Sequence, residues 1–242
     1  MSALLQVTGV TKRFGGFTAL DNVDLVVAPG ERLGLIGPNG SGKSTLVNCI
    51  SGTLRNESGR IELNGRDIGR EPAFKRVHLG VSRSFQIPRP FASMSVIDNL
   101  RIPILYGAKA PVALDTGRAT AEAMQILEQV GLAAKCDAMS RGLTQVDMRK
   151  LELARAIAAK PQLLIADEAM AGLSGNEVSE VLEILFKLNA AGITVIMIEH
   201  IMQAVMRFSQ RVVCLDAGRI ICEGTPSEIV ANGDVQKAYL GA

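Results

Sequence analysis

Residues 37–45 read Gly-Pro-Asn-Gly-Ser-Gly-Lys-Ser-Thr, and this stretch decides the fold. It has the spacing of a phosphate-binding loop: a glycine, four residues of any type, then Gly-Lys-Ser. It follows an apolar run at residues 34–36 and leads into residues 46–52, which have helical character. Glycines allow successive N–H groups to point at phosphate oxygens, and the following helix adds the positive end of its dipole. The loop predicts a nucleotide-phosphate site; the alternative is a glycine-rich turn without a ligand.

Strands and helices alternate around this loop. Residues 4–36 have the pattern of short strands, and residues 60–68 predict a hairpin because Asn64-Gly65 is the strongest two-residue turn signal. Buried strands are expected at 163–166 and 193–198, between helical stretches. The other expected elements are helices within 115–160, ended by Pro161, a helix at 177–191, a hairpin at 211–224 and a last helix from Thr225-Pro226. We predict an α/β P-loop core, a mostly parallel sheet with flanking helices, joined to an N-terminal antiparallel β subdomain and an inserted helical subdomain.

The length of 242 residues suits one large domain or two small ones. We predict a single domain over residues 1–242. Within it, residues 1–88 and 161–242 form the nucleotide-binding core with its β subdomain, and residues 89–160 form the helical subdomain. No apolar stretch approaches the ~20 residues of a membrane span, and the first residues lack the pattern of a signal peptide.

Composition excludes several classes of protein. Apolar residues make up 48% and charged residues 21%, which excludes a disordered chain. The net charge of +2 is too small to favour nucleic acid or an anionic membrane as the main partner. Four cysteines without CxxC spacing indicate neither a zinc site nor a disulfide framework, which is typical of a cytosolic protein.

Polar residues follow two of the buried strands. Asp167 can hold Mg²⁺ through water, and the adjacent Glu168 can orient and deprotonate an attacking water. In the loop, Lys43 supplies charge to the β- and γ-phosphates and the Ser44 hydroxyl is a Mg²⁺ ligand. His200 can contact the γ-phosphate. The alternatives are a helix-capping carboxylate pair and a structural histidine, but the joint presence of all these groups favours the functional interpretation.

Taken together, the motifs resemble the ATP-binding subunit of ABC transporters over essentially the whole chain. Residues 37–45 match the Walker A motif, and LLIADE at 163–168 matches the Walker B motif with its catalytic glutamate. Phe14 stands where the family stacks an aromatic ring on adenine. Gln86, in SRSFQIPRPF, matches the Q-loop glutamine, and His200, in IMIEH, matches the switch histidine.

The resemblance implies that two such subunits sandwich two ATP molecules, each between one Walker A motif and the other subunit's signature motif. It implies Mg²⁺ held by Ser44, Gln86 and Asp167. The residues implied in catalysis are Glu168, His200, Lys43 and Gln86. The residues implied in binding ATP are Phe14, Gly37, Pro38, Asn39, Gly40, Ser41, Gly42, Lys43, Ser44 and Thr45.

Four stretches, residues 13–25, 82–100, 149–158 and 224–242, look like the importer branch for branched-chain and other hydrophobic amino acids. This implies transmembrane permease subunits as partners, a substrate-binding protein as an indirect one, and a peripheral position on the cytoplasmic face of the membrane; nucleic acid is not an expected partner. In the family, residues 87–105 form much of the groove that receives a permease helix, and Phe91 and Met94 are our candidate contacts. The alternative is that this segment is ordinary subdomain core.

The signature motif departs from the family pattern. Counting back from Asp167 places it on Leu143, Thr144, Gln145, Val146 and Asp147, of which only the leucine and the threonine hydroxyl fit LSGGQ. A long glutamine and a β-branched valine oppose close approach to phosphate, and Asp147 is expected to turn a negative charge toward it. A shifted register on residues 140–142 is the alternative. We predict that the partner's ATP turns over slowly, which favours a heterodimer over a homodimer.

Smaller departures accompany it. Ala169 replaces the usual proline after the Walker B glutamate, and Ser174 stands where an aspartate is common. Two other functions stay open: an ABC ATPase of DNA maintenance or translation, and a regulatory subunit with weak hydrolysis. The first would carry long heptad helices or two cassettes, which this sequence lacks. The second is disfavoured by Glu168 but kept open by the altered residues 143–147.

Overall fold

The computed structural model describes residues 3–85, 88–107 and 115–240. Its strands are β1 (Leu5–Phe14), β2 (Phe17–Val27), β3 (Arg32–Ile36), β4 (Ser58–Leu63), β5 (Arg66–Asp67), β6 (Val81–Ser84), β7 (Leu163–Asp167), β8 (Thr194–Ile198), β9 (Arg211–Asp216) and β10 (Arg219–Gly224). Its helices are α1 (Lys43–Ser51), α2 (Ala73–Leu79), α3 (Val96–Tyr106), α4 (Thr116–Val130), α5 (Gln145–Ala158), α6 (Gly175–Ala190), α7 (Met202–Phe208), α8 (Pro226–Ala231) and α9 (Gly233–Leu240). Short 3₁₀ turns lie at Ala133–Lys135 and Ser140–Gly142.

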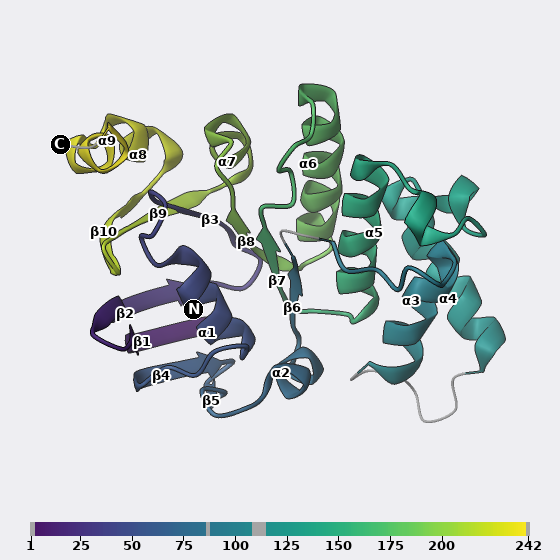
Figure 1. The fold of residues 1–242 in the computed structure, drawn as a ribbon, viewed down its shortest axis with the longest axis horizontal. Helices are drawn as coiled ribbons and strands as arrows, with labels where there is room; N and C mark the ends of the chain where they lie inside the picture. Colours follow the sequence, from purple (N-terminus) through teal and green to yellow (C-terminus); the bar gives the residue numbers. More distant parts are fainter. Residues whose placement is uncertain (1–2, 86–87, 108–114, 241–242) are drawn as a thin grey trace.

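Two sheets carry the architecture (Figure 1). The first is antiparallel, in the order β2-β1-β4-β5. The second has the order β10-β9-β3-β8-β7-β6, and it is parallel from β9 to β6 with β10 as an antiparallel edge strand. Helices α3, α4 and α5 pack together at the far side of the molecule from the antiparallel sheet. The predicted fold class is confirmed.

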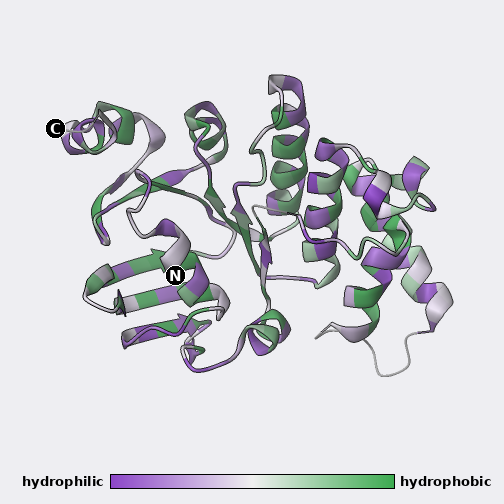
Figure 2. Cartoon of the chain, viewed as in Figure 1, coloured by the Kyte–Doolittle hydropathy of each residue, from purple (hydrophilic) through white to green (hydrophobic). Residues whose placement is uncertain are grey.

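The parallel sheet is buried on both faces. Strands β7 and β8 are buried at every residue, as their continuous apolar sequences predict. Leu33 and Leu35 of β3 face a core shared with α1 and the antiparallel sheet, whereas Ile36 faces the core built by α3 to α6. Figure 2 shows hydrophobic residues concentrated in the central sheet and interspersed with hydrophilic ones along α5 and α6. Helix α1, and with it the end of the phosphate loop, is therefore held between the two sheets.

Some of the turns and helices predicted from the sequence are confirmed, and others differ from the prediction. Asn64 and Gly65 both have positive φ, 51° and 74°, so the predicted hairpin is confirmed. The predicted last helix is in fact two helices, because the side chain of Asn232 accepts the N–H groups of Asp234 and Val235 and starts α9. Helix α2 was not predicted.

No described helix combines the length and the apolar content needed to cross a membrane. The division of the chain into residues 1–88 with 161–242 and residues 89–160 stays a prediction.

Candidate functional site

The phosphate loop joins the end of β3 to the start of α1, and tight backbone packing requires glycine at two of its positions. A Cβ on Gly37 would lie 2.1 Å from the carbonyl oxygen of Leu215, and one on Gly42 would lie 2.6 Å from that of Ala19. Both glycines also have positive φ. The curled backbone is thus fixed from outside by β9 and β2.

Lys43 lies inside this loop. Its Nζ donates hydrogen bonds to the carbonyl oxygens of Gly37 at 2.6 Å and Pro38 at 2.9 Å, and to the Ser41 hydroxyl at 3.4 Å. Burial lowers the pKa of Lys43, while the nearby carboxylate of Glu168 opposes this shift. The ammonium group is held within the loop, which is where a phosphate would be cradled.

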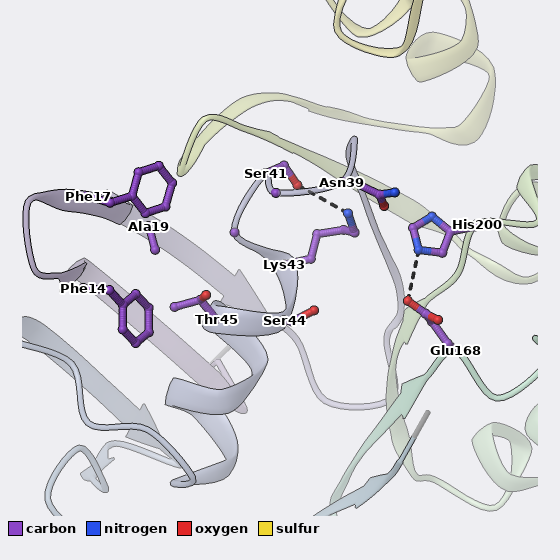
Figure 3. Close-up of a pocket in the computed structure, with 12 residues that line it drawn as sticks. Phe14, Phe17, Ala19, Asn39, Ser41, Lys43, Ser44, Thr45, Glu168 and His200 are labelled. Carbon is purple, nitrogen blue, oxygen red and sulfur yellow. Dashed lines mark hydrogen bonds and ion pairs between the residues drawn. The ribbon is translucent and has the colours of Figure 1, made fainter. Parts of the chain in front are cut away.

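A single pocket brings together most of the residues singled out in the sequence (Figure 3). In Figure 3, Phe14 and Phe17 lie at one end, Glu168 and His200 at the other, and Lys43 between them. Its lining consists of Phe14, Phe17, Ala19, Asn39, Gly40, Ser41, Gly42, Lys43, Ser44, Thr45, Glu168 and His200. Phe17 was not predicted from the sequence. The pattern that could have indicated it is a second phenylalanine separated from Phe14 by only two glycines.

Glu168 and His200 face each other across the ends of two neighbouring strands. His200 Nε2 and Glu168 Oε1 are 3.0 Å apart. Glu168 follows β7 with a positive φ of 47°, and its N–H donates to the carbonyl oxygen of Ile198 at the end of β8. A non-glycine residue in this conformation is strained and persists only where its surroundings enforce it. The strained turn directs the Glu168 carboxylate into the pocket.

Asp167, the last residue of β7, lies beside a basic group that the sequence reasoning missed. Its Oδ2 accepts a hydrogen bond of 2.6 Å from Arg83 of β6, and Arg83 also donates to Asn48 of α1 at 2.6 Å. Asp167 and Ser44 line a common pocket. A carboxylate and a hydroxyl are the oxygen ligands that Mg²⁺ prefers, so the donor set fits this ion. Gln86 lies outside the described residues.

Comparisons with known proteins identify the family of the chain. The family model for ABC transporters matches residues 20–171, and that for the branched-chain amino acid ATP-binding cassette transporter matches residues 219–242. The chain belongs to the ABC transporter family. It is therefore an ATP-hydrolysing protein of the ABC type.

Individual relatives match nearly the full length of this ABC ATPase. The high-affinity branched-chain amino acid transport ATP-binding protein LivG of Escherichia coli K12 is 37% identical, with 98% of both chains covered. The protein BraF of Pseudomonas aeruginosa, which carries the same description, is 36% identical at the same coverage. A crystal structure of an ATP-binding cassette of an ABC transporter in its ADP conformation superposes with a TM-score of 0.90 at 30% identity, with 100% of both chains covered.

The segment aligned with the family signature forms the start of helix α5. The Thr144 hydroxyl accepts the N–H of Asp147 at 3.3 Å and donates to its Oδ2 at 2.7 Å. Asp147 is only 5% exposed and forms an ion pair with Lys135. Although burial opposes ionisation, the hydrogen bonds from Lys135 and Thr144 hold the pKa of Asp147 below its usual value. The expectation that Asp147 turns its charge toward phosphate is wrong, because this carboxylate is bonded within its own subunit to Lys135 and to the Thr144 hydroxyl.

The other residues of this region also have partners in the same chain. Gln145 Nε2 donates to the carbonyl oxygen of Ala171 at 3.2 Å. In the alternative register, Ser140 is fully buried and its hydroxyl donates to the carbonyl oxygen of Phe91 at 2.9 Å. Ser140 is thus a structural residue, which disfavours the shifted register.

The segment proposed to receive a permease helix is partly core. Val96, Leu100 and Ile104 of α3 are buried. Before α3, Phe91 is 40% exposed, with the Arg155 guanidinium 4.8 Å from its ring centre, and Met94 is half-buried. Both candidate contacts lie in the part of the segment that precedes α3.

Proposed function

We propose that this ABC ATPase is the ATP-hydrolysing subunit of an importer of branched-chain or other hydrophobic amino acids. The observation that carries the proposal is the agreement of two comparisons: residues 219–242 match the family model of the branched-chain amino acid cassette, and 98% of the chain aligns with LivG and BraF. A role in DNA maintenance or translation is not favoured by these relatives.

ATP would lie along the pocket from Phe14 to Glu168. The Phe14 ring stacks on adenine, and the amides of residues 39–45 and the Lys43 ammonium bind the phosphates. Ser44, Asp167 and Gln86 would hold Mg²⁺, which neutralises phosphate charge when bound. Most of the catalysis is thus positioning and electrostatic stabilisation.

Glu168 is the residue we propose to polarise the attacking water. Its carboxylate lies 3.0 Å from His200 Nε2, so the histidine holds it at the phosphate end of the pocket. His200 is half exposed there and can also steady the γ-phosphate as charge redistributes. The pair therefore supplies a base and an adjacent hydrogen-bond donor at the point of bond cleavage.

The proposed partners are transmembrane permease subunits, a substrate-binding protein that acts through them, and a second ABC ATPase. We place this chain itself peripherally on the cytoplasmic face of the membrane. We favour a heterodimer because Gln145 and Val146 stand where the family signature has small residues, and because the Asp147 carboxylate is bonded to Lys135 and Thr144 of the same chain. Phe91 and Met94 are the proposed contacts with a permease helix, on the helical part at residues 89–160.

A pull-down of the tagged chain from membranes tests the assignment. We expect permease subunits and a second ATPase to co-purify, and uptake of labelled leucine to fail when Glu168 is replaced by Gln. Recovery without any membrane partner, or unchanged uptake, would contradict the proposal.

The asymmetry has its own test in the assembled complex. Glu168→Gln should abolish most ATP turnover, because the partner's signature covers this chain's ATP. The equivalent change in the partner should cost less, because the altered residues 143–147 cover that ATP. Equal losses from the two changes would exclude the asymmetry.

A further inference from the structure

The turn that begins at Glu168 is hydrogen-bonded to side chains from two other parts of the chain, helix α5 and the residue that follows β8. It covers residues 168–173 and contains two residues with positive φ, Glu168 at 47° and Gly172 at 79°. Glycine adopts a positive φ without strain, but Glu168 keeps this conformation only when surrounding contacts enforce it. Three side chains outside the turn, Glu199, Arg149 and Gln145, supply such contacts.

Glu199 holds the turn from the side of β8. Its Oε1 accepts the N–H of Met170 at 2.8 Å, and its side chain is buried at 2% exposure. Since the chain continues from Glu199 directly into His200, one short segment contacts both Glu168 and the turn behind it. The carboxyl group thus fixes the position of the turn relative to the end of β8.

Gln145 and Arg149 hold the turn from the side of α5. Gln145 Nε2 and Arg149 Nη2 donate to the same acceptor, the carbonyl oxygen of Ala171, at 3.2 Å and 3.3 Å. The two residues are four apart, so they lie on one face of the helix. Arg149 also donates to the carbonyl oxygen of Phe85 at 3.3 Å. Helix α5 therefore contacts the chain both before residue 86 and after Glu168.

Gln145 also packs closely against Gly172, in addition to its hydrogen bond to Ala171. A Cβ on Gly172 would lie 2.5 Å from Gln145 Nε2, so the amide group fills the space that this glycine leaves. Gln145 is one of the signature residues that depart from the family pattern. In this chain its long side chain has a partner within the same subunit.

We propose that Gln145, Arg149 and Glu199 form a brace of positioning residues that fixes the turn behind Glu168 and ties it to the first turns of α5. The proposal rests on the role of Glu168 given above. Movement of α5 relative to the parallel sheet would then be transmitted to the carboxylate that acts on water, without any change at the phosphate loop.

Hydrogen exchange of the Met170 amide in the full chain, followed by NMR, tests the brace directly. Glu199→Ala removes the acceptor, so we expect this amide to exchange about ten-fold faster. Glu199→Gln keeps an acceptor oxygen at the same place and should restore slow exchange. An unchanged exchange rate in Glu199→Ala would overturn the proposal.

Steady-state ATP turnover supplies the second readout. Gln145→Ala removes an exposed side chain and leaves the core intact. With the partner's equivalent glutamate changed to glutamine, so that turnover reports on this chain's own ATP, we expect kcat to fall about three- to ten-fold with KM for ATP unchanged within about two-fold. Lys150→Ala is the matched control, because Lys150 lies on the same helix but bonds to Glu180 of α6. A rise in KM at constant kcat, or an equal loss in the control, would overturn the brace.

These results separate the brace from the role of Glu168. If Glu168→Gln keeps normal turnover, the proposed base is wrong, while the exchange rates of Met170 still decide whether the turn is held by Glu199. If Glu168→Gln is inactive and Gln145→Ala is fully active, the base stands and the brace is wrong.

Discussion

In the proposed mechanism, the N-terminal end of α1 faces this chain's own ATP and that of α5 faces the partner's ATP. The two helix ends are nevertheless built in opposite ways. Helix α1 begins after Gly42, a residue that has no side chain to accept the first N–H groups. Helix α5 begins after Thr144, whose hydroxyl accepts the N–H of Asp147, and Asp147 adds a buried carboxylate. The first four N–H groups of a helix lack partners within it and can bind an anion only if the chain leaves them open. The difference therefore explains why we expect phosphate binding at α1 and a weak contribution from α5.

The largest effect is expected from Glu168→Gln, in the pocket that the start of α1 lines. Removing a general base costs ~10²–10⁴ in rate, so turnover should fall by that factor while ATP binding stays within about three-fold. Turnover and calorimetric affinity of the purified chain or complex are the measurements. Glu180→Gln, an exposed carboxylate on α6, is the control. Near-normal turnover in Glu168→Gln would remove the catalytic role from this end of the pocket.

A second prediction concerns Glu199, whose carboxylate accepts the N–H of Met170 in the turn after Glu168. Burial, with a further contribution from the negative charge of Glu168, raises the pKa of Glu199 from 4.5 to about 7, against the N–H of Met170 and the charge of Arg149. The folded chain thus keeps a proton that the unfolded chain loses, so this residue destabilises the fold progressively as pH rises from about 4.5 to 7. Glu199→Gln should remove that dependence.

The measurement is the free energy of unfolding of both proteins between pH 5 and 8. We expect the advantage of Glu199→Gln to grow with pH and to reach at most about 3 kcal/mol above pH 7. A constant difference across this range would show that Glu199 titrates normally in the folded chain.

A third prediction distinguishes the two aromatic residues at the other end of the pocket. Stacking on a base contributes about 1–3 kcal/mol, so Phe14→Ala should weaken ATP binding about ten-fold. Phe17→Ala should have a smaller effect, because Phe17 is more exposed, 62% against 47% for Phe14. If Phe17→Ala weakens binding more, then Phe17 is the partner of adenine.

The smallest effect is expected at the start of α5, which Thr144 caps. Thr144→Val removes the hydroxyl that caps α5, which should lower the free energy of unfolding by about 1 kcal/mol. The affinity of the phosphate loop for ATP should not change, because Thr144 and Lys43 belong to different helix ends. A loss of affinity in Thr144→Val would show that the two ends are not independent.

The sequence predicted those parts of the structure that depend on local patterns. Strands β7 and β8 follow from unbroken apolar runs, and the β4–β5 hairpin follows from Asn64-Gly65. The phosphate loop and the polar strand ends could be placed in one pocket because parallel strands end at the same edge of a sheet. The helix-capping role of Thr144 was not recognised, although Thr144 and Asp147 have the spacing of a capping pair.

The parts that were missed depend on contacts between distant residues. Helix α2 has seven residues and is stabilised by Arg76, which donates to the carbonyl oxygens of Cys49 and Ile50 at the end of α1. The orientation of Asp147 was not predicted because it depends on an ion pair with Lys135. Lys135 lies in a 3₁₀ turn that no sequence periodicity indicates. Arg83 could not be assigned to Asp167, because their contact depends on the pairing of β6 with β7.

The central claim is that residues 37–45 grip the phosphates of ATP, and a calorimetric titration tests it most directly. With Mg²⁺ present and a non-hydrolysable ATP analogue as ligand, the full chain should bind about one nucleotide, and Lys43→Ala should weaken that binding at least ~100-fold, since it removes a buried charge from the phosphates. Absence of binding by the unmodified chain, or equal affinity in Lys43→Ala, would contradict the account.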